Sequence, residues 1–102
     1  MIKGYILPMG TVVKVKNGEQ KAMIIGRAQL FKDNDAMGYF DYCAVPYPQG
    51  PTGESEFGFF NDEDVAEVIF EGYRSEDEIE FANSYEETVK KAPYPKLQVG
   101  SS

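Results

Sequence analysis

The sequence predicts a mainly β protein with one C-terminal helix, an α+β fold. Between residues 11 and 73, short runs of β-branched and aromatic residues are separated by turn-forming Gly, Pro, Asn and Asp, which is the pattern of short strands. Residues 75–92 instead repeat apolar side chains at helical spacing. The chain has 102 residues, is 42% hydrophobic and contains seven Phe and seven Tyr, which is enough for one modest core in one domain.

The first two strands are predicted to form a hairpin. Thr11 to Lys16 alternates Val13 and Val15 with lysines, the pattern of a half-buried strand. Asn17-Gly18 follows, and this pair readily adopts the positive φ values of a type I′ turn. The returning strand, Lys21 to Ala28, is more continuously apolar, so we expect it to lie in the middle of the sheet.

A third strand is predicted from Tyr39 to Val45, between two loops. Residues 32–38 form the first predicted loop, whose Asp and Asn residues resemble a calcium loop only superficially. The fifth position is Met37 and the twelfth is Ala44, and neither supplies the oxygen ligand that calcium requires there. The second predicted loop is the Pro- and Gly-rich stretch 46–53, because proline lacks the amide donor that strand pairing needs.

Residues 57–73 are predicted to form a strand, a single helical turn and a second strand. They hold the densest aromatic and β-branched material in the chain, interrupted once by the polar stretch Asn61 to Asp64. Asn61 can cap a short turn whose first residues are acidic, which suits the positive end of a helical turn. In the second strand, alternation places Val68 and Phe70 together on one face, which we expect to be buried.

The C-terminal helix is predicted from its cap and its apolar stripe. Ser75 with Glu78 three residues later matches a capping box, and Pro93 stops the helix. The apolar stripe comprises Ile79, Phe81, Ala82, Tyr85, Val89 and Ala92. We therefore expect a single domain over residues 1–93 and a flexible tail over residues 94–102.

Together these elements predict a small SH3-like fold, a partly closed antiparallel barrel of about five strands. A single-turn helix precedes the last strand, and the terminal helix covers the open side. A curled five-stranded sheet packed on the helix is the near alternative.

The charge distribution restricts the partners. Net charge is −7; residues 1–53 carry six Lys/Arg against four Asp/Glu, and residues 54–102 carry four against thirteen. An acidic surface repels nucleic acid and anionic membranes, so we expect neither as a partner. The acidic half should instead steer the protein toward a basic protein. The plainer alternative is that these acids only keep the helix and the outer sheet face soluble.

The residue inventory argues against an enzyme. The chain has no His and a single cysteine, Cys43, which excludes His-dependent triads, Cys-His dyads, Cys/His zinc sites and an intramolecular disulfide. A carboxylate pair is formally possible among Asp62, Glu63, Asp64 and Glu67. Such pairs work when burial separates their pKa values, whereas we expect these four in an exposed turn. We therefore predict no catalytic residues, no metal and no cofactor.

Surface aromatic and acidic residues are the candidates for protein binding. Most aromatic side chains should fill the core, but Tyr47 and Tyr73 adjoin turns and could contact an extended or proline-rich peptide. The terminal helix could instead dock on a helical partner. The predicted protein-binding residues are Tyr47, Asp62, Glu63, Asp64, Glu67 and Tyr73.

No secretion signal is recognisable in residues 1–10, and no apolar run approaches the length of a membrane span. We therefore expect a cytoplasmic protein without membrane insertion.

Four motifs, which together span residues 7–73, carry a family resemblance. They are Leu7-Pro8-Met9-Gly10-Thr11-Val12-Val13; Met23-Ile24-Ile25-Gly26-Arg27; Phe40-Asp41-Tyr42 with Pro46-Tyr47-Pro48-Gln49-Gly50; and Phe59-Phe60-Asn61-Asp62-Glu63-Asp64-Val65 with Val68-Ile69-Phe70-Glu71-Gly72-Tyr73. In these motifs the chain resembles an uncharacterised bacterial family, numbered 4176 among domains of unknown function.

The resemblance implies an accessory role in secretion. Members of that family look like small Gram-positive proteins encoded beside LXG-type toxins and their helical targeting partners at type VII secretion loci. The implied function is that of a chaperone or targeting adaptor that binds such a toxin in the cytoplasm. The alternative is an immunity protein that blocks the toxin's active domain, since an acidic surface can meet a basic enzyme cleft. The resemblance transfers no binding residues, and the oligomeric state stays open.

Overall fold

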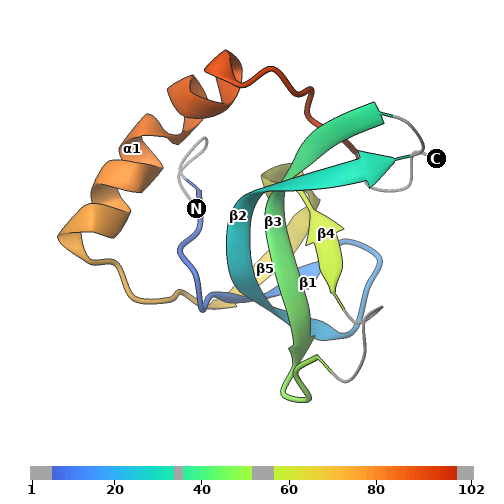
Figure 1. The fold of residues 1–102 in the computed structure, drawn as a ribbon. Coiled ribbons are helices and arrows are strands. Elements are labelled where there is room, and N and C mark those ends of the chain that lie inside the picture. The colour runs from blue at the N-terminus through green and yellow to red at the C-terminus, as the bar shows by residue number, and fades with distance from the viewer. Residues whose placement is uncertain (1–5, 34–35, 52–56, 99–102) are drawn as a thin grey trace.

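The computed structural model describes residues 6–33, 36–51 and 57–98, which form one antiparallel sheet and one long helix (Figure 1). In chain order the elements are β1 Val12–Val15, β2 Lys21–Asp33, β3 Ala36–Tyr47, β4 Gly58–Phe60, the 3-10 turn η2 Asp62–Asp64, β5 Val65–Phe70 and α1 Glu76–Lys91. The strand order is β4-β3-β2-β1-β5. The predicted α+β fold with five antiparallel strands and a C-terminal helix is confirmed.

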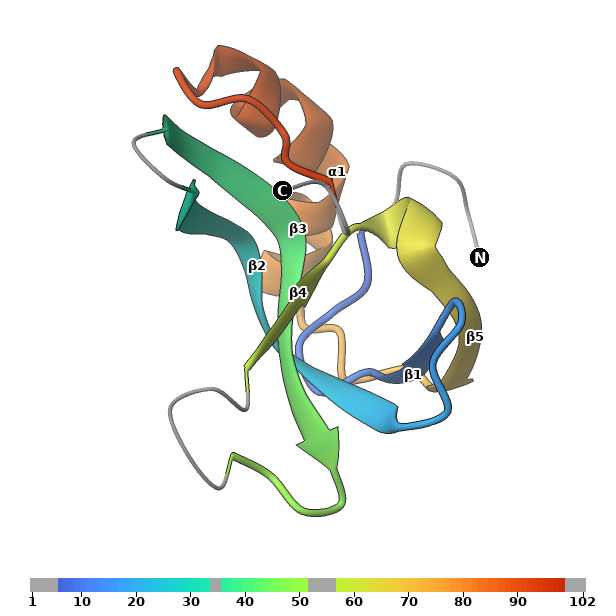
Figure 2. The ribbon, with the colours of Figure 1, turned by 90° about the vertical axis from the view of Figure 1, so that its right-hand side faces the viewer.

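The sheet is curled but not closed. β1 to β4 form a meander, and η2 then leads the chain back so that β5 pairs with β1. β4 and β5 are the two edges of the sheet, and the long strands β2 and β3 bend between them (Figure 2). The single-turn helix therefore lies where the sequence predicted it, between the last two strands.

The β1–β2 hairpin is confirmed, but its predicted type I′ turn is wrong. Asn17 has φ 66°, whereas Gly18 does not take a positive φ. The Gly18 N–H donates to the Val15 carbonyl at 3.0 Å, so Lys16 and Asn17 occupy the centre of the turn. The Lys16 N–H also donates to the carbonyl of Asp64 in η2 at 2.8 Å, which joins the turn to the segment before β5.

β2 and β3 pair much further than predicted. The ladder continues to the pair Asp33 and Ala36, so the predicted loop 32–38 is wrong; residues 34 and 35 lie outside the described part of the chain. An aromatic cluster explains the extension. The Phe31 ring lies 5.8 Å from the Phe40 ring and 5.0 Å from the Phe59 ring, measured between centroids, and such contacts stabilise neighbouring strands.

A bulge corrects the prediction for β5. Val12 pairs with Phe70 and Val13 pairs with Val68, with a register shift between the two pairs. Because Val12 and Val13 are adjacent in their strand, they point to opposite faces. Val68 consequently packs on the core, whereas Phe70 is 62% exposed. The expectation that both side chains are buried is therefore wrong for Phe70.

The core lies between the inner face of the sheet, the N-terminal segment and α1. Residues 6–11 run between the helix and the sheet (Figure 1). The core residues are Ile6, Leu7, Val13, Ile24, Tyr42, Ala44, Phe60, Ala82 and Tyr85. The sheet thus buries its concave side against two separate chain segments.

α1 begins as predicted and is fastened to the sheet by a charge pair. The Ser75 side chain accepts from the Glu78 N–H at the helix start. The Glu78 carboxylate lies 2.6 Å from the Arg27 guanidinium of β2, and both side chains are about nine-tenths buried. Arg27 also donates to the Leu7 carbonyl and stacks 4.3 Å from the centre of the Phe81 ring. This helix is the longest in the described residues, and none there is long and apolar enough to span a bilayer.

Residues 95–97 lie beside β3. The Tyr39 N–H donates to the Pro95 carbonyl at 3.0 Å, and the Leu97 N–H donates to the Tyr39 carbonyl at 2.8 Å. Lys96 therefore forms a parallel bridge with Tyr39. Within the predicted tail 94–102, this part is ordered against the sheet, and residues 99–102 lie outside the described range.

Candidate functional site

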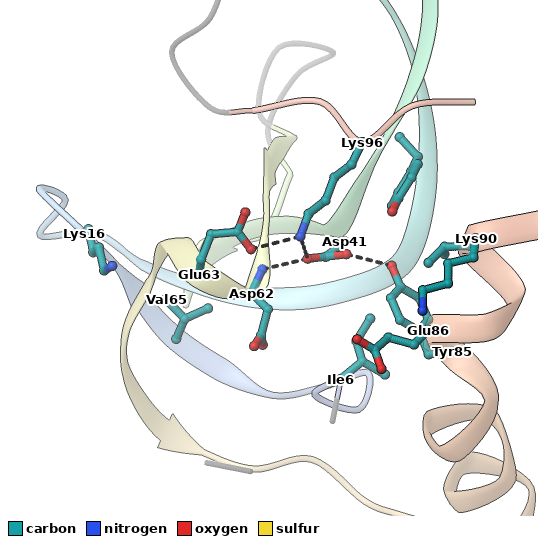
Figure 3. Close-up of a pocket in the computed structure, with 12 residues that line it drawn as sticks. Ile6, Lys16, Asp41, Asp62, Glu63, Val65, Tyr85, Glu86, Lys90 and Lys96 are labelled. Carbon is teal, nitrogen blue, oxygen red and sulfur yellow. Dashed lines mark hydrogen bonds and ion pairs between the residues drawn. The ribbon is translucent and has the colours of Figure 1, made fainter. Parts of the chain in front are cut away.

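A cleft of about 670 Å³ opens between η2, the end of β3 that carries Tyr39 and the second half of α1 (Figure 3). It is lined by Ile6, Lys16, Tyr39, Asp41, Asp62, Glu63, Val65, Tyr85, Glu86, Val89, Lys90 and Lys96. Four acids and three lysines therefore face one hollow.

Asp41 lies at the centre of this cleft and is only 4% exposed. Its Oδ1 accepts from the Tyr85 hydroxyl at 2.9 Å. Its Oδ2 accepts from the Asp62 N–H at 2.9 Å and lies 3.1 Å from Lys96 Nζ. Both oxygens are thus occupied by groups of this chain, as a buried carboxylate requires.

Asp62 is half-buried, so the prediction that it lies in an exposed turn is wrong. The Tyr42 hydroxyl donates to Asp62 Oδ1 at 2.6 Å and accepts from the Leu7 N–H at 2.9 Å. Burial raises the pKa of the Asp62 carboxyl, and the hydrogen bond from Tyr42 only partly offsets it. Burial and the bond to Asp62 also raise the pKa of Tyr42, which keeps that hydroxyl protonated as a donor.

Glu63 forms the outer wall of the cleft. Its Oε1 lies 2.9 Å from Lys96 Nζ. Partial burial is the largest influence and acts to raise the pKa of Glu63, but the hydrogen bond with Lys96, a backbone hydrogen bond and the charges of Lys96 and Lys16 together outweigh it, so the net shift is downward. For Lys96, burial acts to lower the pKa, while the bonds to Glu63 and Asp41 raise it, and the net shift is upward. The pair is therefore charged at neutral pH.

The contacts of Asp41 in the cleft are structural. A general acid or base must present a free oxygen to a substrate, whereas both oxygens of Asp41 bind groups of this chain, namely Tyr85, Lys96 and the Asp62 amide. Asp62 uses one oxygen, Oδ1, to bind Tyr42. Within residues 6–33, 36–51 and 57–98, no three or more His, Cys, Asp or Glu side chains are grouped to hold a metal ion.

A second hollow, the apolar groove, lies on the outer face of the sheet and has a volume of about 470 Å³. It is lined by Gly10, Val12, Lys21, Met23, Tyr47, Ile69 and Phe70. The pairing of Val12 with Met23 and with Phe70 brings three strands together here. Ile69, Phe70 and Tyr47 are exposed, so the groove offers large apolar side chains to a partner.

The predicted protein-binding residues are divided between different surfaces. Tyr47 lines the apolar groove, whereas Asp62 and Glu63 line the cleft. Tyr73 is 84% exposed and lies between β5 and α1. Glu67 is exposed on β5, where it pairs with Lys14 of β1.

Asp64, the remaining predicted residue, closes η2 by accepting from the Asn61 N–H at 2.9 Å. The Asn61 side chain is buried and takes no part in this turn. It accepts from the Asp41 N–H at 3.0 Å and donates to the Leu97 carbonyl at 2.6 Å.

Sequence reasoning missed Asp41, Lys96 and Phe70. A carboxylate between aromatic residues in an otherwise apolar strand is a readable signal for Asp41, because such a group must be paired when it is buried. Phe70 gave no signal, since only the bulge exposes it. Lys96 gave none because its partners lie far away in sequence.

A protein-family model matches most of this chain. The model of the family described as Domain of unknown function (DUF4176) matches residues 6–81, which include the whole sheet and the start of α1. No curated protein and no solved structure matches the chain.

Proposed function

This chain belongs to the family Domain of unknown function (DUF4176), and we propose that it is a protein-binding accessory factor and not an enzyme. It acts in the cytoplasm as a chaperone or targeting adaptor that binds an LXG-type toxin for type VII secretion. The bound surface is the apolar groove.

The exposed apolar side chains of the groove are the observation that carries this proposal. Phe70, Ile69 and Tyr47 line a hollow at the junction of β1, β2 and β5. Clustered exposed apolar residues are characteristic of protein interfaces. Aromatic residues in a concave site are also the usual energetic centre of such interfaces.

The charge of the chain supports a basic toxin segment as the occupant. Net charge is −7, and Glu67 is exposed on the strand that carries Phe70. A segment with apolar side chains would fill the groove, whose lining carries one charged residue, Lys21, and flanking Lys or Arg would complement the net negative charge of the chain. The choice of an LXG toxin is supported by the resemblance of the motifs in residues 7–73.

Co-expression with the LXG protein encoded nearby tests the proposal. Size-exclusion chromatography should show the two proteins eluting together, and fragments of the toxin should locate the bound region. If neither the toxin nor any fragment of it co-elutes with this chain, the proposal fails.

An immunity protein is the second candidate function, favoured by the thirteen acids in residues 54–102. Such a surface could cover a basic enzyme cleft. A survival assay separates the two functions: protection of cells from the isolated toxin domain supports immunity. Loss of export without loss of protection in a deletion strain supports the adaptor.

A further inference from the structure

The segment Pro95–Leu97, here called the tail segment, is held by contacts of three kinds. Its backbone bridges Tyr39 through two hydrogen bonds of 3.0 and 2.8 Å. Its Leu97 carbonyl accepts from the Asn61 side chain at 2.6 Å. Its Lys96 ammonium lies between Asp41 and Glu63, at 3.1 and 2.9 Å.

The surface that holds the tail segment, here called the tail seat, is shaped for these contacts. It comprises Gly38, Tyr39, Asp41, Asn61 and Glu63. A Cβ atom at residue 38 would overlap the Leu97 side chain, so a glycine there leaves room for an aliphatic residue. Asp41 is buried and needs a cation nearby. The seat therefore selects an extended backbone, a lysine and an aliphatic residue in that order.

The family model covers the tail seat but not the tail segment that occupies it. All five seat residues lie within the matched range 6–81, whereas the tail segment lies beyond it. The seat residues therefore lie in the part of the chain that the family model covers, whereas the model covers neither the tail segment nor the second half of α1.

We propose that the tail seat is a strand-addition site for an extended segment of a partner protein in which lysine precedes an aliphatic residue. The tail segment is its resident occupant, and the partner segment displaces it. The existence of such a partner rests on the proposed function, whereas the chemistry of the seat does not. Backbone pairing supplies part of the affinity, and the lysine and leucine positions supply specificity.

The tail segment competes with any other segment for the tail seat and so lowers the apparent affinity of that segment. A tethered segment has an effective concentration on the order of millimolar. A free peptide of the same sequence must therefore bind the intact chain much more weakly than a chain whose tail segment has been disabled.

Peptide binding to the full-length chain tests this inference. The probe is a capped, fluorescently labelled peptide Pro-Tyr-Pro-Lys-Leu-Gln, which is the sequence of residues 93–98. The chain with Lys96→Ala and Leu97→Ala should bind it at least about tenfold more tightly than the unmodified chain. A peptide with alanine in place of both Lys and Leu should not bind.

Two glycine substitutions give a matched pair of controls. Gly38→Ala, added to the chain that carries Lys96→Ala and Leu97→Ala (the tail-disabled chain), should abolish peptide binding. Its Cβ occupies the space that the leucine side chain of the peptide needs. Gly58→Ala should not change binding, because its Cβ would make only an ordinary 3.9 Å contact with the Ala44 carbonyl.

Amide hydrogen exchange provides a second measurement, independent of any partner. In the unmodified chain, the Leu97 and Tyr39 amides should be protected, and Gly38→Ala should speed their exchange at least about tenfold while the β2–β3 ladder stays protected. Failure of the tail-disabled chain to bind the peptide, or equal binding after Gly38→Ala, would overturn the inference. Leu97 protection that vanishes on dilution would also overturn it, because the occupant would then belong to a second copy. None of these outcomes depends on toxin binding, which is tested separately by co-elution.

Discussion

The Tyr85 hydroxyl of α1 donates to the Asp41 carboxylate of β3 across 2.9 Å. The same carboxylate also receives the Asp62 amide and the Lys96 ammonium. Helix, η2 and tail segment therefore meet at one buried charge. This convergence explains how an acid is accommodated inside an aromatic strand, since each contact offsets part of the cost of removing Asp41 from water.

Replacing Tyr85 with Phe removes one of these contacts and leaves Asp41 Oδ1 without its donor. We expect Tyr85→Phe to lower the free energy of unfolding by about 1–3 kcal/mol, measured by urea denaturation followed by circular dichroism. Tyr73→Phe is the matched control and should change stability by less than about 0.5 kcal/mol, because Tyr73 is exposed. Equal stability of Tyr85→Phe and the unmodified chain would contradict the role assigned to Asp41.

Breaking the buried charge pair should be more damaging. Glu78→Ala leaves the Arg27 guanidinium buried without its carboxylate, and Arg74 also loses its 2.9 Å contact with Glu78. We expect a loss of about 3–5 kcal/mol, seen as a lower midpoint in thermal and urea unfolding. Glu80→Ala on the exposed side of α1 is the control, with an expected change below about 0.5 kcal/mol. Similar midpoints for the two variants would show that the pair does not fasten the helix.

The raised pKa of Asp62 predicts a specific pH dependence. The Asp62 carboxyl has a pKa near 3.8 in the unfolded chain and a higher pKa in the folded chain, so the folded chain holds the proton more tightly. The contribution of Asp62 to stability therefore falls as pH rises from the unfolded pKa through the folded pKa. Asp62→Asn removes this loss, and its amide oxygen can still accept from Tyr42. The variant should gain stability relative to the unmodified chain across that window and keep the gain at pH 7. A relative loss of stability in that window would contradict the assigned cause.

The β1–β5 bulge predicts opposite outcomes for two neighbouring apolar residues. Val68 packs on the core, so Val68→Asp places a charge there and should lower stability by at least about 3 kcal/mol. Phe70 faces solvent, so Phe70→Asp should change stability by less than about 1 kcal/mol. Urea unfolding curves of the two variants measure both changes in stability. If both unfold the chain, Phe70 is a core residue and the bulge is wrongly placed.

Local patterns in the sequence were sufficient to predict the fold. Alternation around Val13, the cap at Ser75 and the stop at Pro93 are decided by residues a few positions apart, and the structure keeps all three as expected. The acidic turn after Asn61 was also predicted from neighbouring residues, but the Asn61 side chain that was expected to cap it binds Asp41 and Leu97 instead.

The site was less predictable because it depends on register and on distant contacts. The exposure of Phe70 follows from a one-residue shift against β1, which reverses the face of a strand without changing its composition. The burial of Asp62 follows from Tyr42, twenty positions earlier in the chain. The place of Lys96 follows from Asp41 and Glu63, and no local pattern of residues 94–98 indicates them.

Isothermal titration of the proposed LXG-type partner, or of a fragment that co-elutes, into this chain tests the role of the apolar groove most directly. Phe70→Asp should weaken binding at least about tenfold, which is about 1.4 kcal/mol. Ile79→Asp, an equally charged change at an exposed apolar residue of α1, should leave binding unchanged. Toxin binding that is lost with Ile79→Asp but retained with Phe70→Asp would place the interface on the helix and contradict the groove as the binding surface.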